Sequence, residues 1–444
     1  MKILVIGGGA REHTLVWKLV QSPRVGKVFA APGNAGTAAI GENLDLRPTD
    51  IEGLAKIAKE KGIDLVVVGP EAPLASGMVD YFDSLGIPIF GPTKAATQIE
   101  SSKAFARSLM EKYGIPCPRG AIFFSYSKAR EYLQEQRLPV VIKADGLAAG
   151  KGVIIARSLA GAHKALGDIM EARIFGSAGD RVVIDEYLSG REVSLIAFTD
   201  GKTVSPMVPA CDYKKVGDDD QGPNTGGMGS YSPSGFFSAG MTERVTKDIL
   251  LRAVKAMAKE GLPYKGVLYA GVMVVNGEPV VLEFNARFGD PETQVILPLL
   301  KTDLVDILMG VVQGNLDQVK IEWSPGACVG VVVASGGYPG SYKTGFPVQG
   351  IDSVDKDVLV FHAGTELGRD GTIYTNGGRV LTVAGGGRDI TEAREKVYRN
   401  IRGIRFEGCY YRKDIALREM DAINSKLSAP NTRRKPTGGS HHGA

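Results

Sequence analysis

One strand-like segment in the second half of the chain carries side chains that can hold a divalent cation. In VLEFNARFGDPETQ, residues 281–294, Glu283 and Asn285 lie two positions apart, so a strand places both on one face. Carboxylate and amide oxygens suit Mg²⁺, which takes few protein ligands and keeps several waters. Arg287 continues the alternation and could hold a carboxylate or phosphate in a fork. A half-exposed edge strand would explain the alternation but not the turn into FGDPET, so we predict a functional site.

A glycine-rich loop at residues 144–152, ADGLAAGKG, lies between two apolar strand segments. It is not a P-loop, because three residues instead of four separate its first two glycines and Gly152 follows the lysine. With Lys143 at its base and Lys151 within it, the loop could close over the phosphates of a nucleotide. An exposed Gly-Lys hairpin without a ligand is the alternative.

The N-terminal segment ILVIGGGAREHT places three glycines between an apolar strand and the start of a helix. Gly7 and Gly9 match the first two glycines of the dinucleotide-binding pattern GxGxxG, but Glu12 occupies the third position. A carboxylate there repels a pyrophosphate, and no acidic residue ends the second strand to hold a ribose hydroxyl. We therefore expect one phosphate group on the backbone N–H groups of residues 7–10, with Glu12 facing another part of the ligand.

The acidic segment GDDDQGPNTGGMGS, residues 217–230, resembles a calcium-binding loop because Asp218 and Asp220 alternate. Gly229, however, stands where such a loop needs a bidentate carboxylate. We expect a mobile loop, in which the glycines at 226–229 let the backbone approach a ligand.

The composition is typical of a soluble globular protein and shows no large excess of positive or negative charge. The chain has 444 residues, 43% hydrophobic and 23% charged, and its net charge of +4 gives no support to nucleic-acid binding. The four cysteines lie far apart and form no CxxC pair, which favours reduced thiols over disulfides or a zinc site. Because no apolar stretch could span a bilayer and no signal peptide is recognisable, we expect a cytoplasmic protein with no membrane partner.

The pattern of strands and helices predicts a multidomain α/β and α+β protein. Residues 1–100 alternate apolar strands with helices, which indicates an N-terminal domain with a parallel sheet covered on both faces. Residues 101–325 form a central domain with antiparallel hairpins, one expected around Ser189-Gly190 and one at Asn276-Gly277.

The last part of the chain is expected to be smaller and less regular. Residues 326–425 indicate a C-terminal β-rich domain with one helix near 390–402. Residues 430–444 have the composition of a disordered tail, and the two histidines in it indicate a flexible end more than a metal site.

Together, the motifs resemble those of the phosphoribosylamine–glycine ligase family (glycinamide ribonucleotide synthetases) in the ATP-grasp superfamily. The resemblance covers almost the whole chain, with the motifs in the family's order: GGGAREH, GPEAPL, ESSKAF, VIKADGLAAGKGV, DYKK, GPNTGGMGSYSP, GVLYAG, EFNARFGDPETQ, GGYPG, FHAGT and YRKDIA. GPNTGGMG and RFGDPETQ are highly specific, whereas VIKADGLAAGKGV alone indicates only the superfamily. Cys211, Lys215 and Ser101 depart from the family pattern.

The resemblance implies an ATP-grasp fold whose central domain is interrupted by a lid at about 120–190, and it implies roles for individual residues. The implied ATP-binding residues are Lys103, Lys143, Gly150, Lys151, Gly152, Glu186, Leu188 and Glu192. The implied substrate-binding residues are Gly7, Gly9, Glu12, Glu71, Asp212, Lys214, Gly227 and Arg287. Glu283 and Asn285 would hold Mg²⁺ or Mn²⁺, and Arg287, Lys143 and Asp212 would be catalytic.

The resemblance also implies a reaction, the ATP-dependent ligation of glycine to 5-phosphoribosylamine in de novo purine biosynthesis. Because a carboxylate is a poor electrophile, glycine would first become glycyl phosphate, and the amine would then displace phosphate to give glycinamide ribonucleotide. Alternatives are another ATP-grasp carboxylate–amine ligase or carboxylase, a non-catalytic nucleotide sensor, and an NAD-dependent oxidoreductase. We expect a monomer that acts on small molecules and has no nucleic-acid partner.

Overall fold

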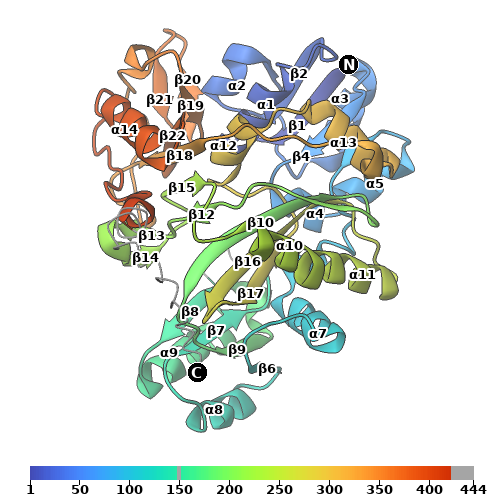
Figure 1. The fold of residues 1–444 in the computed structure, drawn as a ribbon, viewed down its shortest axis with the longest axis vertical. Helices are drawn as coiled ribbons and strands as arrows, with labels where there is room; N and C mark the ends of the chain where they lie inside the picture. The colour runs from blue at the N-terminus through green and yellow to red at the C-terminus, as the bar shows by residue number, and fades with distance from the viewer. Residues whose placement is uncertain (148–151, 422–444) are drawn as a thin grey trace, which may run out of the picture.

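The computed structural model describes residues 1–147 and 152–421. The expected disordered tail at 430–444, Gly150 and Lys151 lie outside the described residues. Figure 1 shows an N-terminal and a C-terminal unit side by side above a central sheet, with a small antiparallel unit below it. No helix within the described ranges combines the length and apolar character of a membrane span.

The N-terminal region forms a five-stranded parallel sheet of order β3-β2-β1-β4-β5 with helices around it. Alternate residues of β1 face two different cores: Ile3 and Val5 join a core shared with the central and C-terminal regions, whereas Leu4 and Ile6 join a core within the N-terminal region. The shared core fixes the glycine turn after β1 against the rest of the molecule. The elements are β1 (Lys2–Gly7), α1 (Ala10–Leu19), β2 (Lys27–Pro32), α2 (Ala35–Ile40), β3 (Glu42–Asn43), α3 (Ile51–Lys61), β4 (Leu65–Val68), α4 (Glu71–Ala75), α5 (Met78–Ser84) and β5 (Ile89–Phe90).

A four-stranded antiparallel sheet of order β6-β9-β7-β8 forms the small unit at the bottom of Figure 1. Its apolar cluster consists of residues between 123 and 184, so this unit packs mainly on itself. The N-terminal region leads into it through α6 (Gln98–Ser101) and α7 (Lys103–Tyr113). Its own elements are β6 (Gly120–Phe123), α8 (Tyr126–Gln134), β7 (Val140–Ala144), β8 (Val153–Ala156), α9 (Leu159–Met170) and β9 (Val182–Glu186).

The hairpin expected around Ser189-Gly190 is wrong. The strand before it, β9, pairs with β6 and β7, whereas the strand after it, β10, pairs with β11 and β16 of another sheet. Both strands are apolar and Ser-Gly permits a turn, but local sequence does not reveal that each strand has a distant partner. Residues 187–190 therefore form a crossover between two sheets, and a side chain at Gly190 would overlap the carbonyl of Val274 on β16.

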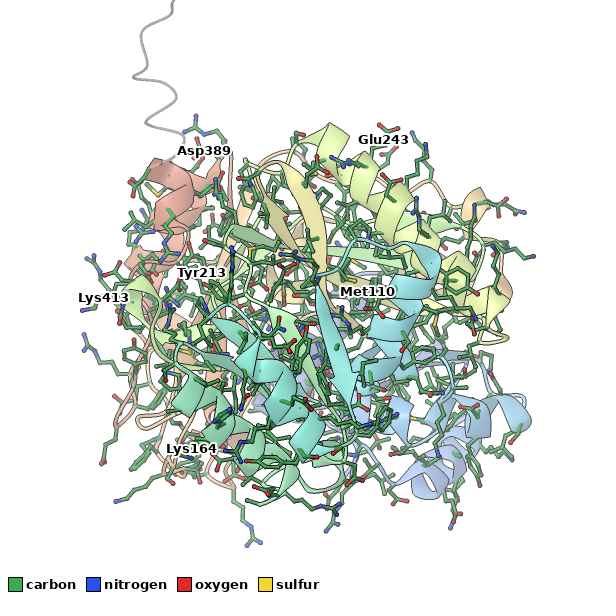
Figure 2. The ribbon with its side chains drawn as sticks, turned by 90° about the horizontal axis from the view of Figure 1, so that it is seen from below. Met110, Lys164, Tyr213, Glu243, Asp389 and Lys413 are labelled. Carbon is green, nitrogen blue, oxygen red and sulfur yellow. The ribbon has the colours of Figure 1, made fainter. Side chains whose placement is uncertain are left out.

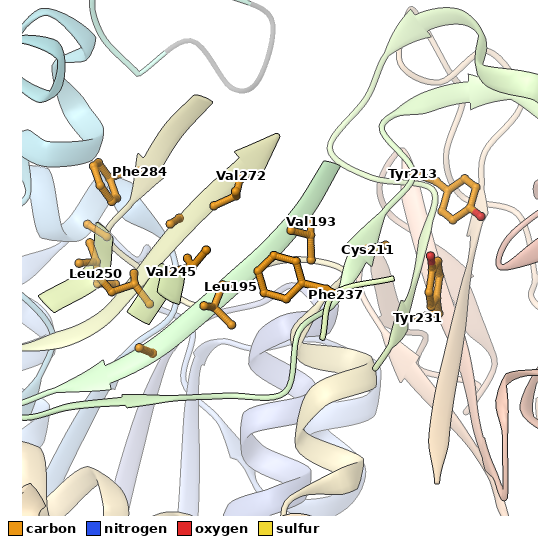
Figure 3. Packing of buried hydrophobic residues seen from close by; sticks show 14 of the residues in the cluster. Val193, Leu195, Cys211, Tyr213, Tyr231, Phe237, Val245, Leu250, Val272 and Phe284 are labelled. Carbon is orange, nitrogen blue, oxygen red and sulfur yellow. The ribbon is translucent and has the colours of Figure 1, made fainter. Parts of the chain in front are cut away.

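The central sheet has the order β11-β10-β16-β17, and its β16–β17 hairpin confirms the turn predicted at Asn276-Gly277, where φ is 51° and 84°. Helices α10 and α11 cover one face, where they pack on β10 and β16 residues such as Val193 and Val272 (Figure 3). On the other face α13 packs on residues such as Phe198. The elements are β10 (Arg191–Thr199), β11 (Val204–Pro206), α10 (Ala239–Val245), α11 (Leu251–Lys259), β16 (Gly266–Val275), β17 (Glu278–Asn285), α12 (Thr293–Ile296) and α13 (Leu304–Gln313).

The sheet of the C-terminal region includes two short strands that flank the acidic, glycine-rich segment. Its order is β12-β15-β18-β22-β19, so β12 and β15, from residues 211–232, form one edge of it. The sheet thus crosses the boundary at 325, and α14 packs on β18 and β22. The elements are β12 (Cys211–Asp212), β13 (Lys215–Gly217), β14 (Gln221–Asn224), β15 (Gly229–Ser232), β18 (Ala327–Ala334), β19 (Val358–His362), β20 (Thr365–Leu367), β21 (Ile373–Thr375), β22 (Arg379–Gly387) and α14 (Ile390–Ile401).

Candidate active site

The end of β17 carries the two predicted metal ligands. Glu283 and Asn285 are half-buried on one face of the strand, while Phe284 between them is buried in the core. Burial opposes ionisation of Glu283, but the nearby lysines Lys214 and Lys103 outweigh it, so the pKa of this carboxyl lies below its ordinary value. The face therefore presents an ionised carboxylate and a neutral amide oxygen, a donor pair suited to a hard cation.

Lys143 lies at the end of β7, at the base of the glycine-rich loop, and is held in place by two acceptors. Its Nζ lies 2.8 Å from Asp185 Oδ2 and donates to the carbonyl of Leu282 at 2.9 Å. Asp185 is itself buried and also pairs with Arg107. Gly152 closes the loop, because its carbonyl accepts from the N–H of Ala144 at 2.8 Å. Lys143 thus links the small lower unit to β17.

Glu192 and Lys214 form an ion pair beside the same strand. The Nζ of Lys214 also lies 4.0 Å from Glu283 Oε1, so the lysine stands between two carboxylates. Burial lowers the pKa of Lys214, but Glu192 and Glu283 raise it by more, and the lysine stays charged.

The remaining predicted ATP-binding residues lie at the two ends of the small lower unit. Lys103 is the first residue of α7, whose N-cap is Ser102. Glu186 ends β9 and accepts from the backbone N–H of Arg119 at 2.8 Å and from its guanidinium Nη2 at 2.9 Å. Leu188 lies in the crossover to β10 and is half-buried. The predicted residues Gly150 and Lys151 fall outside the described part of the chain.

Arg287 lies between two carboxylates. Its Nε is 2.8 Å from Glu71 Oε2 at the start of α4 and 3.3 Å from Glu100 Oε1 on α6. Burial raises the pKa of Glu100, whereas at Glu71 the positive charges of Arg287 and Arg11 outweigh burial and lower the pKa. Glu100 was not predicted from the sequence.

Asp212 is a carboxylate without a hydrogen-bond partner. Its Oδ1 is shielded from solvent and has no donor within the described residues. Burial and the neighbouring carboxylate of Glu292 raise the pKa of Asp212 well above its ordinary value. Glu292 is buried and accepts from Tyr269 Oη at 2.6 Å and Ser194 Oγ at 3.0 Å. A shielded carboxylate oxygen without a donor is costly to an isolated protein and favours a ligand that supplies one.

Gly227 lies directly against Asp212. Its φ of +112° is a conformation that favours glycine, and a Cβ there would overlap Pro291 and lie 2.8 Å from Asp212 Oδ1. The glycine predicted from sequence thus allows the GGMG segment to pass between Asp212 and the GDPET turn.

The N-terminal glycine turn has a different internal arrangement from the one expected. Glu12 is 2% exposed, and its Oε2 accepts from the N–H of Gly9 at 2.7 Å while its Oε1 pairs with Arg11 Nε at 2.6 Å. A Cβ at Gly7 would lie 2.5 Å from Glu12 Cγ, and the φ of Gly7 is +123°. Glu12 therefore stabilises the turn from its buried side, and the N–H of Gly9 already donates its hydrogen bond to Glu12.

A cavity of about 330 Å³ lies between this turn and the C-terminal region. It is lined by Gly8, Gly9, Pro32, Gly33, Asp290, Tyr338, Ala363, Gly364, Thr365, Asn376 and Arg379. Arg379 crosses it, with Nη2 at 3.0 Å from Asp290 Oδ2 and Nη1 at 2.8 Å from the carbonyl of Gly226. Asp290, Thr365 and Arg379 were not predicted from the sequence, although the first two lie in the GDPET and FHAGT motifs.

Two clusters result. The larger one joins Lys143, Glu192, Lys214, Glu283 and Arg287 with their partners around the end of β17. The smaller one is the cavity at the glycine turn, and Arg11 connects the two because its Nη1 donates to the carbonyl of Phe288 at 3.2 Å.

Comparison with known proteins identifies three consecutive matches along the chain. Residues 1–100 match the N domain of phosphoribosylglycinamide synthetase, residues 101–293 its ATP-grasp (A) domain, and residues 328–418 its C domain. The phosphoribosylamine–glycine ligase of Caldanaerobacter subterraneus subsp. tengcongensis is 50% identical over 416 residues, which are 94% of this chain and 99% of the relative. That of Escherichia coli O157:H7 is 47% identical over 425 residues, 95% and 99% of the two chains.

Solved structures confirm the predicted ATP-grasp fold. The crystal structure of phosphoribosylamine–glycine ligase from Thermotoga maritima superimposes with a TM-score of 0.82 at 34% identity, covering 94% of this chain and 100% of that one. The biotin carboxylase domain of Hydrogenobacter thermophilus 2-oxoglutarate carboxylase gives a TM-score of 0.73 at 16% identity, covering 92% and 91%, and shows likeness of fold alone.

Proposed function

This chain belongs to the phosphoribosylglycinamide synthetase (phosphoribosylamine–glycine ligase) family of ATP-dependent ligases of purine biosynthesis, and from that premise we propose which of its residues carry each step. The observation that carries the proposal is the convergence of Lys143, Lys214 and Glu283 at the end of β17. We further propose that the protein acts as a cytoplasmic monomer.

ATP would lie between the small lower unit and the central sheet, with its phosphates at the end of β17. Lys103 and Lys143 would contact the phosphates, Glu192 the ribose, and the crossover at 186–188 the adenine. Glu283 and Asn285 would hold Mg²⁺ or Mn²⁺. Their oxygen-only donor set fits such an ion, because a hard cation takes few protein ligands and can complete its shell with phosphate and water oxygens. When bound, the cation would neutralise charge on the transferred phosphoryl group.

Glycine would bind with its carboxylate near Arg287 and its ammonium near Asp212. A carboxylate oxygen attacks the γ-phosphorus of ATP, the bond from that phosphorus to the β–γ bridging oxygen breaks, and ADP leaves. Lys143 and Arg287 would offset the negative charge that collects in this step. Asp212, with its raised pKa and unpartnered oxygen, would gain a donor from the glycine ammonium.

The cavity at the glycine turn would hold 5-phosphoribosylamine, its phosphate near residues 7–10 at the start of α1. Because Glu12 already engages the N–H of Gly9, polar side chains across the cavity, Thr365 and Asn376, would contribute to phosphate binding. The amine then attacks the acyl carbon of glycyl phosphate, an amide bond forms, phosphate leaves with the electrons of the acyl carbon–oxygen bond, and the nitrogen gives up one proton, which the departing phosphate can take.

The test is phosphate release from ATP by the purified protein with each substrate omitted in turn. The proposal expects release that requires both glycine and phosphoribosylamine. Release driven by a different carboxylate or by bicarbonate would favour the relative-enzyme alternatives, and nucleotide binding without turnover would favour a sensor.

A further inference from the structure

The acidic residues that precede the GGMG segment are bound by the end of the chain. We call residues 410–420 the C-terminal strap. Asp218 Oδ1 accepts from the N–H of Lys413 at 2.7 Å, and the N–H of Asp219 donates to Asp414 Oδ2 at 3.0 Å. Arg418 Nη1 lies 2.7 Å from Asp220 Oδ2. These contacts contradict the expected mobile loop. The first two join residues that are 195 positions apart in the sequence.

Arg412 is the centre of this interface and is fully buried. Its Nε and Nη2 donate to the two carboxylate oxygens of Asp414 at 2.8 and 2.7 Å, and its Nη1 donates to the carbonyl of Lys215 at 2.9 Å. Its guanidinium lies 4.7 Å from the ring centroid of Tyr213. A buried cation requires such complete pairing, and the planar fork of arginine makes contacts that lysine cannot reproduce.

The strap touches the chain on both sides of Lys214. The Oη of Tyr213 accepts from the N–H of Ala416 at 3.0 Å, and the Oη of Tyr410 donates to the carbonyl of Val216 at 2.9 Å. Tyr213 is buried, and Lys413 is exposed at the rim of the view in Figure 2. Figure 3 shows Tyr213 beside Tyr231, and their ring centroids are 6.3 Å apart. The strap thus fixes the backbone from which Lys214 extends.

The segment that carries Asp212 and Lys214 is held by a few backbone contacts: β12 pairs with β15 over two residues, and the carbonyl of Lys214 accepts from the N–H of Thr225 at 2.7 Å. Strand β12 has two residues, and β13 and β14 form a separate two-stranded ribbon with a register irregularity. A two-stranded ribbon is marginally stable alone. The buried Arg412 holds this ribbon at Lys215, directly after Lys214, because its Nη1 donates to the carbonyl of Lys215.

We propose that Arg412 is a positioning residue that places Asp212 and Lys214 for glycine binding. This inference rests on the proposed function, which assigns glycine to that region. It adds a role for the YRKDIA motif, whose side chains touch none of the proposed substrate positions directly.

The rival explanation is that the strap only stabilises the C-terminal region. A purely stabilising residue would lower the melting temperature without changing the relative affinities for the three substrates. Val383, buried on β22 in the core that Ile415 also joins, provides the matched control, because Val383→Ala removes apolar packing there but none of the hydrogen bonds or ion pairs of the strap.

The experiment compares Arg412→Met, Arg412→Lys and Val383→Ala in the full chain. We expect Arg412→Met to raise the KM for glycine by about tenfold or more, and to raise the KM for ATP by clearly less, because Lys214 borders the ATP site only through Glu192 and Glu283. Amide exchange of residues 213–224 should rise in this variant. Arg412→Lys should recover only part of the glycine affinity, and Val383→Ala should lower the melting temperature with an unchanged KM for glycine.

A second variant serves if Arg412→Met does not fold. Tyr410→Phe removes one hydrogen bond at the surface and should raise the KM for glycine by about twofold to tenfold. The inference is overturned if every folded variant among Arg412→Met and Tyr410→Phe leaves the KM for glycine unchanged. It is also overturned if the KM values for glycine and ATP rise equally in these variants. A wild-type protein that releases no phosphate with both substrates would instead overturn the proposed function.

Discussion

Replacing Gly227 by alanine tests the close approach of the GGMG segment to Asp212. The added Cβ would overlap Pro291 and lie 2.8 Å from Asp212 Oδ1, at a φ of +112°. The backbone strain costs about 1–3 kcal/mol, and the overlap about 1–3 kcal/mol more. If the chain relieves this by moving Asp212 or the GDPET turn, we expect kcat/KM for glycine to fall by about 30-fold or more.

Gly226→Ala is the matched control at the neighbouring position. Its Cβ would meet the end of the Arg379 side chain at 3.1 Å, and Gly226 does not have a positive φ. The assay is phosphate release at varied glycine with ATP and phosphoribosylamine saturating, together with the melting temperature. Equal kinetic effects of the two substitutions, or an unchanged kcat/KM in Gly227→Ala, would refute this reasoning.

Two other predictions concern charge and pH. Asp185→Asn should raise the KM for ATP by about tenfold, because Lys143 loses its buried counter-ion. The control Asp168→Asn, which removes an exposed ion pair with Lys164, should change the KM for ATP little. Equal effects of the two substitutions would contradict the role of Lys143 at the ATP phosphates. Burial and the charge of the neighbouring His362 lower the pKa of His13 to about 3. Burial lowers the pKa of His362 to about 4. Between about pH 6.5 and pH 4 the unfolded chain binds these protons and the native protein does not, so stability falls as pH falls. From pH 7 to pH 5 each histidine should lower the free energy of unfolding by about 2 kcal/mol. Denaturant unfolding at the two pH values should therefore show a smaller loss of stability in His13→Gln than in the wild type. An identical pH dependence in the two proteins would contradict this prediction.

Local patterns predicted the elements that depend on local spacing. The alternation around Glu283 and Asn285 lies on a strand in the structure, and Asn276-Gly277 forms the expected turn, because both depend on a few consecutive residues. The parallel N-terminal sheet followed from apolar strands alternating with helices. The resemblance to a known family supplied roles that spacing alone does not give.

Long-range pairing could not be predicted in this way. The crossover at 187–190 resembled a hairpin because strand propensity says nothing about which distant strand is the partner. The contact of Arg412 with Asp220 joins residues 192 positions apart, and nothing in the acidic segment or in YRKDIA indicates that the two pair. Glu12 was expected to face a ligand, but only the folded turn reveals that the N–H of Gly9 is its partner.

The transfer of oxygen from glycine to phosphate tests the central claim most directly. With glycine labelled with ¹⁸O in its carboxylate, the account predicts one labelled oxygen in the phosphate released by the wild-type protein. It predicts loss of this transfer in Glu283→Ala with an unchanged melting temperature, because the carboxylate at the end of β17 would no longer hold the cation. Unlabelled phosphate from the wild type, or full transfer by Glu283→Ala, would contradict the account.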